Sequence, residues 1–339
     1  MAAATDHSMP TPERIFGTLN AYQQTAALKT AIELDVFTAI GQGMNTAKAL
    51  AQKCQASERG MRTLCDFLVI NGFLEKRDHS YELTPDAAIF LNKKSPAYLG
   101  SAVNFLTLPE LMDAFKDLTA IVRNGGSLQG DATTTDPDSP KWVEFARSMA
   151  PLQTLAAEGL AEILDADAGA KWKVLDIAAG HGMYGVTIAK HNPNAEIFAL
   201  DWPRVLEVAE NNAQAAGVAG RYHILPGNAF EVEFGKGYDL ALLTGFLHHF
   251  DPATIEKLLR KIHSALTPSG RVATVEFVPN EDRVSPPTQA AFSMVMLGST
   301  RAGDAYPFSE YERMFRATGF SSNELRRTAG PQSVILSKK

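Results

Sequence analysis

A short apolar segment followed by a glycine-rich turn constrains this chain more than any other feature. Residues 173–177 read Lys-Val-Leu-Asp-Ile, which is typical of a strand buried on both faces of a sheet. Glycine then occurs at Gly180, Gly182 and Gly185. At such a turn the backbone can approach a ligand closely at the start of a helix. The pattern indicates a nucleotide-like cofactor, although a single motif of this kind is weak evidence.

Strands and helices alternate through the rest of the C-terminal half. The apolar segments predict strands near 195–200, 222–225, 240–244 and 271–277, with helices over 183–191, 203–216 and 252–266 between them. Asp251 and Pro252 form a good helix start, with an acidic N-cap before a proline. This alternation predicts a Rossmann-like, doubly wound and mostly parallel α/β sheet.

The first hundred residues have a different, helical pattern. Apolar residues at helical spacing predict one helix from Ala26 to Ile40, ended by glycines, followed by helices over 46–53 and 57–71. A hairpin is expected over 73–84. Three helices and a hairpin are the outline of a winged helix. This segment has 10 Lys and Arg against 10 Asp and Glu, so it lacks the basic face that binds DNA phosphates.

Composition excludes several other classes of protein. The net charge of -6 disfavours nucleic acid and anionic membranes as partners. No stretch of about 18 apolar residues predicts a membrane span, and no secretory signal is recognisable, so we expect a cytoplasmic protein. The only cysteines, Cys54 and Cys65, are expected to be buried thiols rather than a disulfide framework.

Acidic side chains near the glycine turn help to choose between two cofactors. Asp201 follows the next strand, about 20 residues beyond the turn, where a carboxylate can accept both hydroxyls of a ribose. That placement suits both NAD and S-adenosylmethionine. Asp176 lies just before the turn, and its carboxylate would repel a pyrophosphate but attract a cationic amino group or sulfonium. His248 and His249 follow a later strand, at the edge where ligands bind in such folds.

The chain resembles the small-molecule O-methyltransferase family typified by plant caffeic acid and isoflavone enzymes and by bacterial polyketide-tailoring enzymes. The segments that carry the resemblance are residues 27–34, 174–182, 247–251, 275–277, 308–311 and 319–320. The resemblance covers almost the whole chain. It implies a winged-helix dimerisation domain over 10–100, a helical connector over 101–165 that contributes to the substrate pocket, and a class I methyltransferase domain over 166–339. It also implies a homodimer.

The resemblance further implies which residues carry out the reaction. Its general base falls on His248, a position selected over His249 by counting back from the following helix. Glu276 matches an acidic residue that orients the base. The second acidic partner of the family falls on Ala305 here, so the adjacent Asp304 is the candidate to replace it. An imidazole with a pKa near 6.5 is neutral enough at physiological pH to accept a proton from a phenol.

The remaining site residues are assigned from the same resemblance. Those expected to bind S-adenosylmethionine, or its product S-adenosylhomocysteine, are Asp176, Gly180, Gly182, Asp201, Trp202, Gly227, Asn228, Ala229, Phe230 and Thr244. Those expected to line the substrate pocket are Phe105, Trp142, Phe145, Met149, His249, Phe292 and Met296. The chain departs from the family at Ala178 and Ala179, where glycine is usual, and at Asn228, where aspartate is usual. No metal is expected.

The sequence thus predicts an S-adenosylmethionine-dependent O-methyltransferase acting on a small, apolar, aromatic or polyketide-like molecule that carries a hydroxyl. Methylation of carbon, nitrogen or sulfur, or cofactor binding without methyl transfer, remains open on the same fold. A nicotinamide-dependent dehydrogenase and a ligand-sensing DNA-binding protein are less favoured alternatives.

Overall fold

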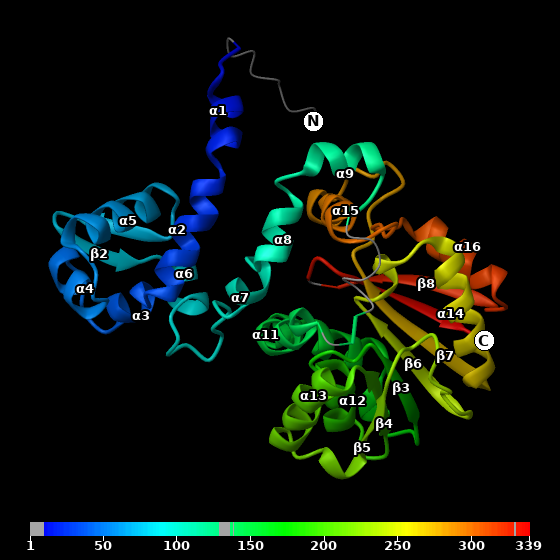
Figure 1. Ribbon diagram of the computed structural model, residues 1–339. Coiled ribbons are helices and arrows are strands. Elements are labelled where there is room, and N and C mark those ends of the chain that lie inside the picture. Colours follow the sequence, from blue (N-terminus) through cyan, green and yellow to red (C-terminus); the bar gives the residue numbers. More distant parts are fainter. Residues whose placement is uncertain (1–9, 129–135, 138, 329) are drawn as a thin grey trace, which may run out of the picture. The chain divides into compact units, whose positions relative to one another are not determined.

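The computed structural model describes residues 10–128, 136–137, 139–328 and 330–339. The chain divides between Val103 and Asn104 into two compact units (Figure 1). Within the described ranges, no helix combines the length and the apolar character that crossing a membrane requires.

The N-terminal unit is helical with one small hairpin. Its elements are α1 (Glu13–Asn20), α2 (Tyr22–Glu33), α3 (Val36–Gly41), α4 (Ala47–Lys53), α5 (Glu58–Ile70), β1 (Leu74–Arg77), β2 (Ser80–Leu83) and α6 (Pro85–Phe90). The single helix predicted from Ala26 to Ile40 is wrong, because the chain breaks at Asp35, which adopts a left-handed φ of 59°. Apolar spacing alone does not reveal such a break, since residues of both α2 and α3 belong to the same hydrophobic core.

Hydroxyl side chains cap three helices of this unit. Thr46, Ser57 and Thr84 each accept a hydrogen bond from a backbone N–H three residues later, at the starts of α4, α5 and α6. These helices enclose a core that includes Phe37, Leu50 and Met61. By contrast, α1 contains no buried residue. Its large apolar side chains are therefore left on the surface.

The C-terminal unit begins with helices and continues as a strand–helix alternation. The elements up to the first strand are α7 (Ala102–Leu106), which spans the boundary, α8 (Pro109–Ala114), α9 (Leu118–Asn124), α11 (Pro140–Ile163) and η1 (Ala166–Ala168). Then follow β3 (Lys173–Ile177), α12 (Met183–His191), β4 (Glu196–Asp201), α13 (Pro203–Ala215), η2 (Ala219–Arg221), β5 (Tyr222–Pro226), β6 (Tyr238–Thr244) and η3 (Leu247–His249). The last elements are α14 (Pro252–Ala265), β7 (Leu266–Glu276), α15 (Pro287–Ser299), α16 (Phe308–Ala317), β8 (Ser322–Arg327) and β9 (Ser333–Lys338).

The strands of this unit form one seven-stranded sheet in the order β5-β4-β3-β6-β7-β9-β8. The pairs from β5 through β7 are parallel, whereas β9 runs antiparallel to both β7 and β8. The predicted doubly wound, mostly parallel sheet is confirmed. The antiparallel pair β8–β9 is an addition that the sequence pattern did not predict.

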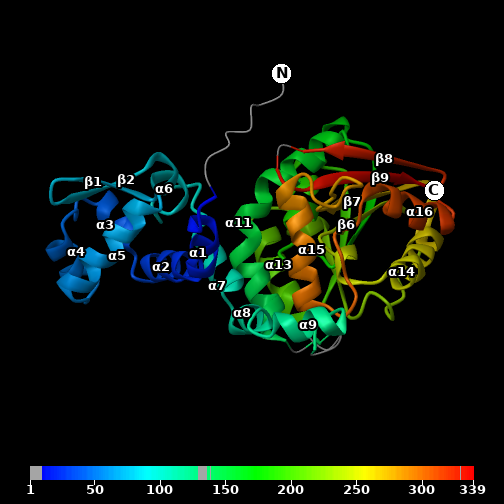
Figure 2. The ribbon, with the colours of Figure 1, turned by 90° about the horizontal axis from the view of Figure 1, so that it is seen from above.

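Helices cover both faces of the sheet (Figure 1). One core lies between the sheet and α14 with α16, and a second lies between the sheet and α11, α12 and α13. The strands in the middle of the sheet are buried on both faces, which explains their continuous apolar sequences. The helices α8 and α9 pack against α15, away from these two cores (Figure 2).

We expect Asp251→Ala to lower the free energy of unfolding by about 1 kcal/mol, because the Asp251 carboxylate caps α14. It accepts hydrogen bonds from the N–H groups of Ala253 and Thr254, at 3.0 and 3.1 Å, and from the Thr254 hydroxyl at 2.7 Å. Urea unfolding followed by circular dichroism measures the change. The exposed Glu207 on α13 gives the matched control, and a loss no larger than that of Glu207→Ala would contradict the prediction.

Candidate active site

A buried histidine–glutamate pair lies where β6 and β7 end. Glu276 is the last residue of β7 and is fully buried, and its Oε2 lies 2.5 Å from Nδ1 of His248. Its other oxygen accepts the backbone N–H groups of Phe246, Leu247 and His248, at 3.1, 2.9 and 3.4 Å. Since a carboxylate only accepts, the proton of the neutral imidazole is assigned to Nδ1. The Nε2 atom of His248 is then left with a lone pair.

A continuous series of ring contacts leads through His248 from the connector helices to α15. Centroid separations along it are 5.1 Å for Phe105–Phe145, 6.2 Å for Phe145–Trp142, 5.5 Å for Trp142–His249, 4.4 Å for His249–His248, 4.9 Å for His248–Phe292 and 4.2 Å for Phe292–Phe277. Five of the residues predicted to line a substrate pocket are therefore joined by contact to the candidate base. Together they give His248 an apolar, aromatic surrounding.

The glycine turn between β3 and α12 is left-handed at three of its positions. Gly180 and Gly182 have φ angles of 58° and 73°, and Ala178 adopts 54°. An L-residue in this left-handed conformation raises the free energy of the fold by about 1–2 kcal/mol. Ala178 adopts the conformation in spite of this cost, so the turn has the same shape there as it would with glycine. A Cβ on Gly182 would come within 2.5 Å of the Tyr222 hydroxyl, which explains why that position has no side chain.

Asp201 is anchored at the end of β4, directly beside this turn. Its carboxylate accepts the N–H of Gly180 at 2.8 Å and that of Trp202 at 2.7 Å. Burial raises the pKa of this group to about 6. The backbone also joins Gly227, after β5, to the carbonyl of Asp201 at 2.9 Å. The predicted cofactor residues at the ends of three neighbouring strands are therefore brought together.

Asp176 is fully buried behind the turn, and the backbone N–H of Gly185 is directed at its carboxylate. Burial raises its pKa to about 7. A Cβ on Gly185 would lie 2.8 Å from one of these oxygens, so only glycine leaves room for the carboxylate. The buried carboxylates of Asp176 and Asp201 suit a cofactor that carries an ammonium, a sulfonium and ribose hydroxyls. The donor set of the site thus fits S-adenosylmethionine.

Several other predicted residues lie around the same strand ends. Trp202 packs with Trp142 in a small apolar cluster. Asn228 uses its Oδ1 to accept the N–H of Phe230 at 3.0 Å. The positions of the remaining predicted residues are the end of β6 for Thr244, a buried position after β5 for Ala229, α11 for Met149 and a buried position on α15 for Met296.

Asp304 is not part of the His248–Glu276 network. Its carboxylate instead forms an ion pair with Arg283 at 2.8 Å, and Arg283 also contacts Glu310. Ala305, where the family has its second acidic residue, is fully buried. A role for Asp304 beside the base stays a prediction that this geometry does not favour.

Three residues of the site were not predicted. Phe277 stacks on Phe292, and His181 stacks at 6.0 Å on Phe145. Lys141 has only 9% of its surface exposed, and its ammonium lies over the Trp142 ring. The position of His181 between two glycines of the turn was an available signal. A lysine in the first turn of a helix has no such signal, because lysine there is usually solvated.

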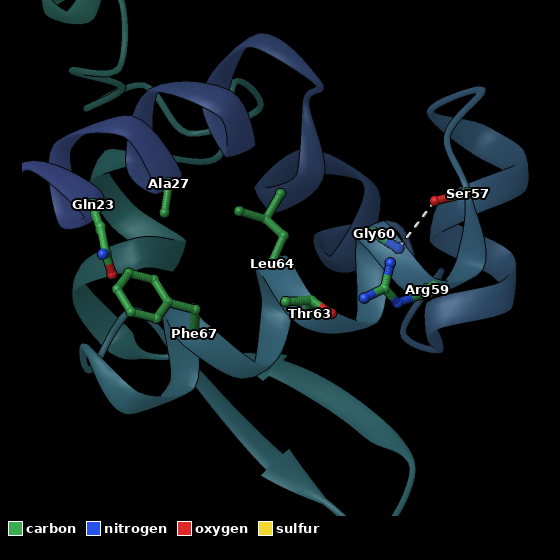
Figure 3. A pocket seen from close by; sticks show the side chains of 8 residues that line it. All are labelled: Gln23, Ala27, Ser57, Arg59, Gly60, Thr63, Leu64 and Phe67. Carbon is green, nitrogen blue, oxygen red and sulfur yellow. Dashed lines mark hydrogen bonds between the residues drawn. The ribbon is translucent and has the colours of Figure 1, made fainter.

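The described side chains include no group of three or more His, Cys, Asp or Glu placed to hold a metal ion. A separate open pocket occurs in the N-terminal unit, between α2 and α5 (Figure 3). Its lining residues are Gln23, Ala27, Ser57, Arg59, Gly60, Thr63, Leu64 and Phe67. None of the predicted catalytic or cofactor residues lines it.

Two family models match the chain. The O-methyltransferase domain matches residues 111–321, and the O-methyltransferase dimerisation domain matches residues 16–93.

Known proteins are similar over nearly the full length. A crystal structure of a candidate O-methyltransferase from Nostoc punctiforme is 51% identical, covers 98% of this chain and all of its own, and superposes with a TM-score of 0.93. The structure of PigF with S-adenosylhomocysteine is 25% identical, with a TM-score of 0.85, over 97% of this chain and all of its own. The 3-hydroxy-5-methyl-1-naphthoate 3-O-methyltransferase of Streptomyces sahachiroi is 29% identical, over 91% of this chain and 89% of its own.

We expect Asp176→Asn to remove a pH dependence of stability. An unfolded aspartate has a pKa near 4, whereas burial raises the pKa of Asp176 in the fold to about 7. Between these values the folded state binds the extra proton, so the free energy of unfolding of the parent protein falls as pH rises. The variant lacks this loss, and its advantage should therefore grow from pH 4 to 7 and then level off.

Urea unfolding of the cofactor-free protein at a series of pH values measures this difference. The exposed Glu207→Gln is the matched control. A stability difference between Asp176→Asn and the parent that is the same at pH 5 and pH 8 would show that the carboxylate is not held in its neutral form by burial.

Proposed function

The chain belongs to the family of S-adenosylmethionine-dependent O-methyltransferases, and we propose that it methylates a hydroxyl of a small aromatic or polyketide-like molecule with His248 as the general base. The observation that carries this proposal is the 2.5 Å contact between Nδ1 of His248 and the fully buried carboxylate of Glu276. That contact leaves Nε2 as the proton acceptor, among aromatic rings.

In this proposal the proton moves from the acceptor hydroxyl to Nε2 of His248. The imidazole becomes an imidazolium, and Glu276 stabilises that charge across the existing hydrogen bond. Glu276 also fixes the ring orientation, because three backbone N–H groups hold the same carboxylate in place. General-base catalysis of this kind contributes about 10²–10⁴-fold to the rate.

When bound, S-adenosylmethionine supplies a methyl group that is already activated on a sulfonium. Asp201 would accept hydrogen bonds from its ribose, and Asp176 would counter its positive charge. The turn at Gly180 and Gly182 lets the backbone approach it. The remaining requirement is position, because alignment of an acceptor oxygen for transfer can account for about 7–11 kcal/mol of the barrier.

The acceptor is proposed to be aromatic because of what surrounds the base. Phe292 meets the ring of His248 edge to face at 4.9 Å, and Trp142 meets His249 in the same way at 5.5 Å. Aromatic side chains in such arrangements favour contact with another ring. The Streptomyces relative named above and a tetracenomycin polyketide 8-O-methyltransferase, 24% identical, act on molecules of this kind.

The N-terminal unit contains a dimerisation domain, and we propose that it forms a homodimer. Ile15, Phe16 and Leu19 of α1 are 63%, 58% and 67% exposed. Large apolar side chains grouped on one short helix are costly to leave in water, and a second copy would cover them. The exact domain boundaries and a cytoplasmic location stay predictions from the sequence.

We expect His248→Ala to lower turnover at least about 100-fold while cofactor affinity stays within a few-fold, because His248 acts on the acceptor proton. Methyl transfer from labelled S-adenosylmethionine to a panel of small phenols measures turnover, and mass spectrometry identifies the O-methyl product. Calorimetry with S-adenosylhomocysteine measures affinity. Asp201→Ala is the contrasting variant, with loss of cofactor affinity as its first effect. Unchanged turnover in His248→Ala would show that His248 is not the general base.

We expect the double change Phe16→Asp and Leu19→Asp to convert a dimer into a monomer, because two buried carboxylates would replace apolar contacts between the copies. Sedimentation velocity of the full chain gives the mass in solution. Arg77→Asp in the exposed hairpin serves as the control for added negative charge. A parent protein that sediments as a monomer at micromolar concentration would contradict the proposed homodimer.

A further inference from the structure

Lys141 is a buried cation beside the candidate active site. It lies in the first turn of α11, with 9% of its surface exposed. Its ammonium is 4.5 Å from the centre of the Trp142 ring. Within the described part of the chain, no hydrogen bond or ion pair joins this ammonium to an acceptor. An ammonium that has lost most of its water without gaining a carboxylate is unfavourable in the free protein.

Two further polar atoms next to Lys141 also lack partners. Nε1 of Trp142 and Nδ1 of His249 are both buried without a hydrogen-bond partner. Their rings meet edge to face at 5.5 Å, and His249 lies against His248 at 4.4 Å. The indole N–H can only donate, and a neutral imidazole nitrogen can also donate. Three groups able to donate therefore lie in succession from the candidate base to the start of α11.

The electrostatic surroundings of this group match a negative ligand. Burial lowers the pKa of Lys141, and the nearby carboxylate of Glu110 opposes that shift. Glu110 is an exposed residue on α8, so water screens its charge. Burial also lowers the pKa of His249 well below its usual value, and the charges of His248 and Lys141 lower it further. The unpartnered polar groups beside His248 are thus one ammonium and two ring nitrogens that can donate.

We propose that the acceptor molecule carries an anionic oxygen group, a carboxylate or its equivalent, in addition to the hydroxyl that is methylated, and that Lys141, Trp142 and His249 bind this group. The proposal rests on the proposed function and narrows its substrate class. The hydroxyl lies at His248, and the negative group lies toward the first turn of α11. There the unpaired backbone N–H groups of the helix start add to the positive potential.

The test is a comparison of binding, so that it does not depend on catalysis. The full-length protein saturated with S-adenosylhomocysteine is titrated by calorimetry with 3-hydroxy-2-naphthoate, 6-hydroxy-2-naphthoate and the uncharged 2-naphthol. We expect at least one acid to bind about 10- to 100-fold more tightly than 2-naphthol, which is the usual effect of a hydrogen bond to a charged group. Equal or weaker binding of both acids, or no binding of any of the three, overturns the proposal.

Variants of Lys141 then test whether this residue causes the tighter binding of the acid. Lys141→Met keeps the length of the side chain and should abolish the preference for the acid, whereas Lys141→Arg should retain most of it. Lys116→Met, at an exposed position in the turn that follows α8, is the matched control for the loss of one positive charge. A preference that persists in Lys141→Met would assign the discrimination elsewhere and overturn the role of Lys141.

The binding comparison and the methyl-transfer assay can give different answers, so the anionic group and the proposed reaction are tested independently. Methyl transfer to uncharged phenols together with equal binding of acids and 2-naphthol would leave the methyltransferase assignment intact and overturn the anionic acceptor. Preferred binding of an acid, with no methylated product from any phenol, would support the anionic site and count against the proposed reaction.

Discussion

The carboxylate of Glu276 holds the site together. It is fully buried at the end of a central strand, where an unpaired charge would be strongly destabilising. Three backbone N–H groups and one imidazole converge on it, so the short helical turn after β6 has its orientation fixed by the neighbouring strand. The same contacts that make the buried charge tolerable therefore determine where Nε2 of His248 lies.

Much of the fold could be predicted from sequence, because β3 and β6 in the middle of the sheet are buried on both faces and read as apolar runs. The start of α14 was equally clear, since Asp251 and Pro252 form a standard helix start. The break at Asp35 was not, because a left-handed residue leaves the spacing of buried side chains nearly unchanged. The edge strand β8 is mostly polar and half exposed, so its sequence resembles a loop.

The positions of site residues were predictable where the order of the strands determines them. They were less predictable where a side chain can form a hydrogen bond or ion pair with any of several neighbours. The glycine turn and Asp201 follow from strand order, but they suit two cofactors equally well. The carboxylate of Asp176 favours S-adenosylmethionine, and the family match agrees with it. Glu276 was predicted from the resemblance to the family, and the structure places it at the end of β7 in contact with His248. Asp304 was predicted because it is next to Ala305 in the sequence. In the structure its carboxylate forms an ion pair with Arg283 instead of contacting His248. Lys141 has no sequence signal, because its burial depends on tertiary packing.

The position of β9 has a consequence for biosynthesis. This strand joins β7 to β8 in the sheet, although it is the last of the seven along the chain. Until residues 333–338 have left the ribosome, β7 has an open edge and the hydrogen-bonding groups of its backbone are available to other strands. The growing chain therefore passes through a stage in which the strand that carries Glu276 can pair with another molecule, and protection by a chaperone would matter most at that stage.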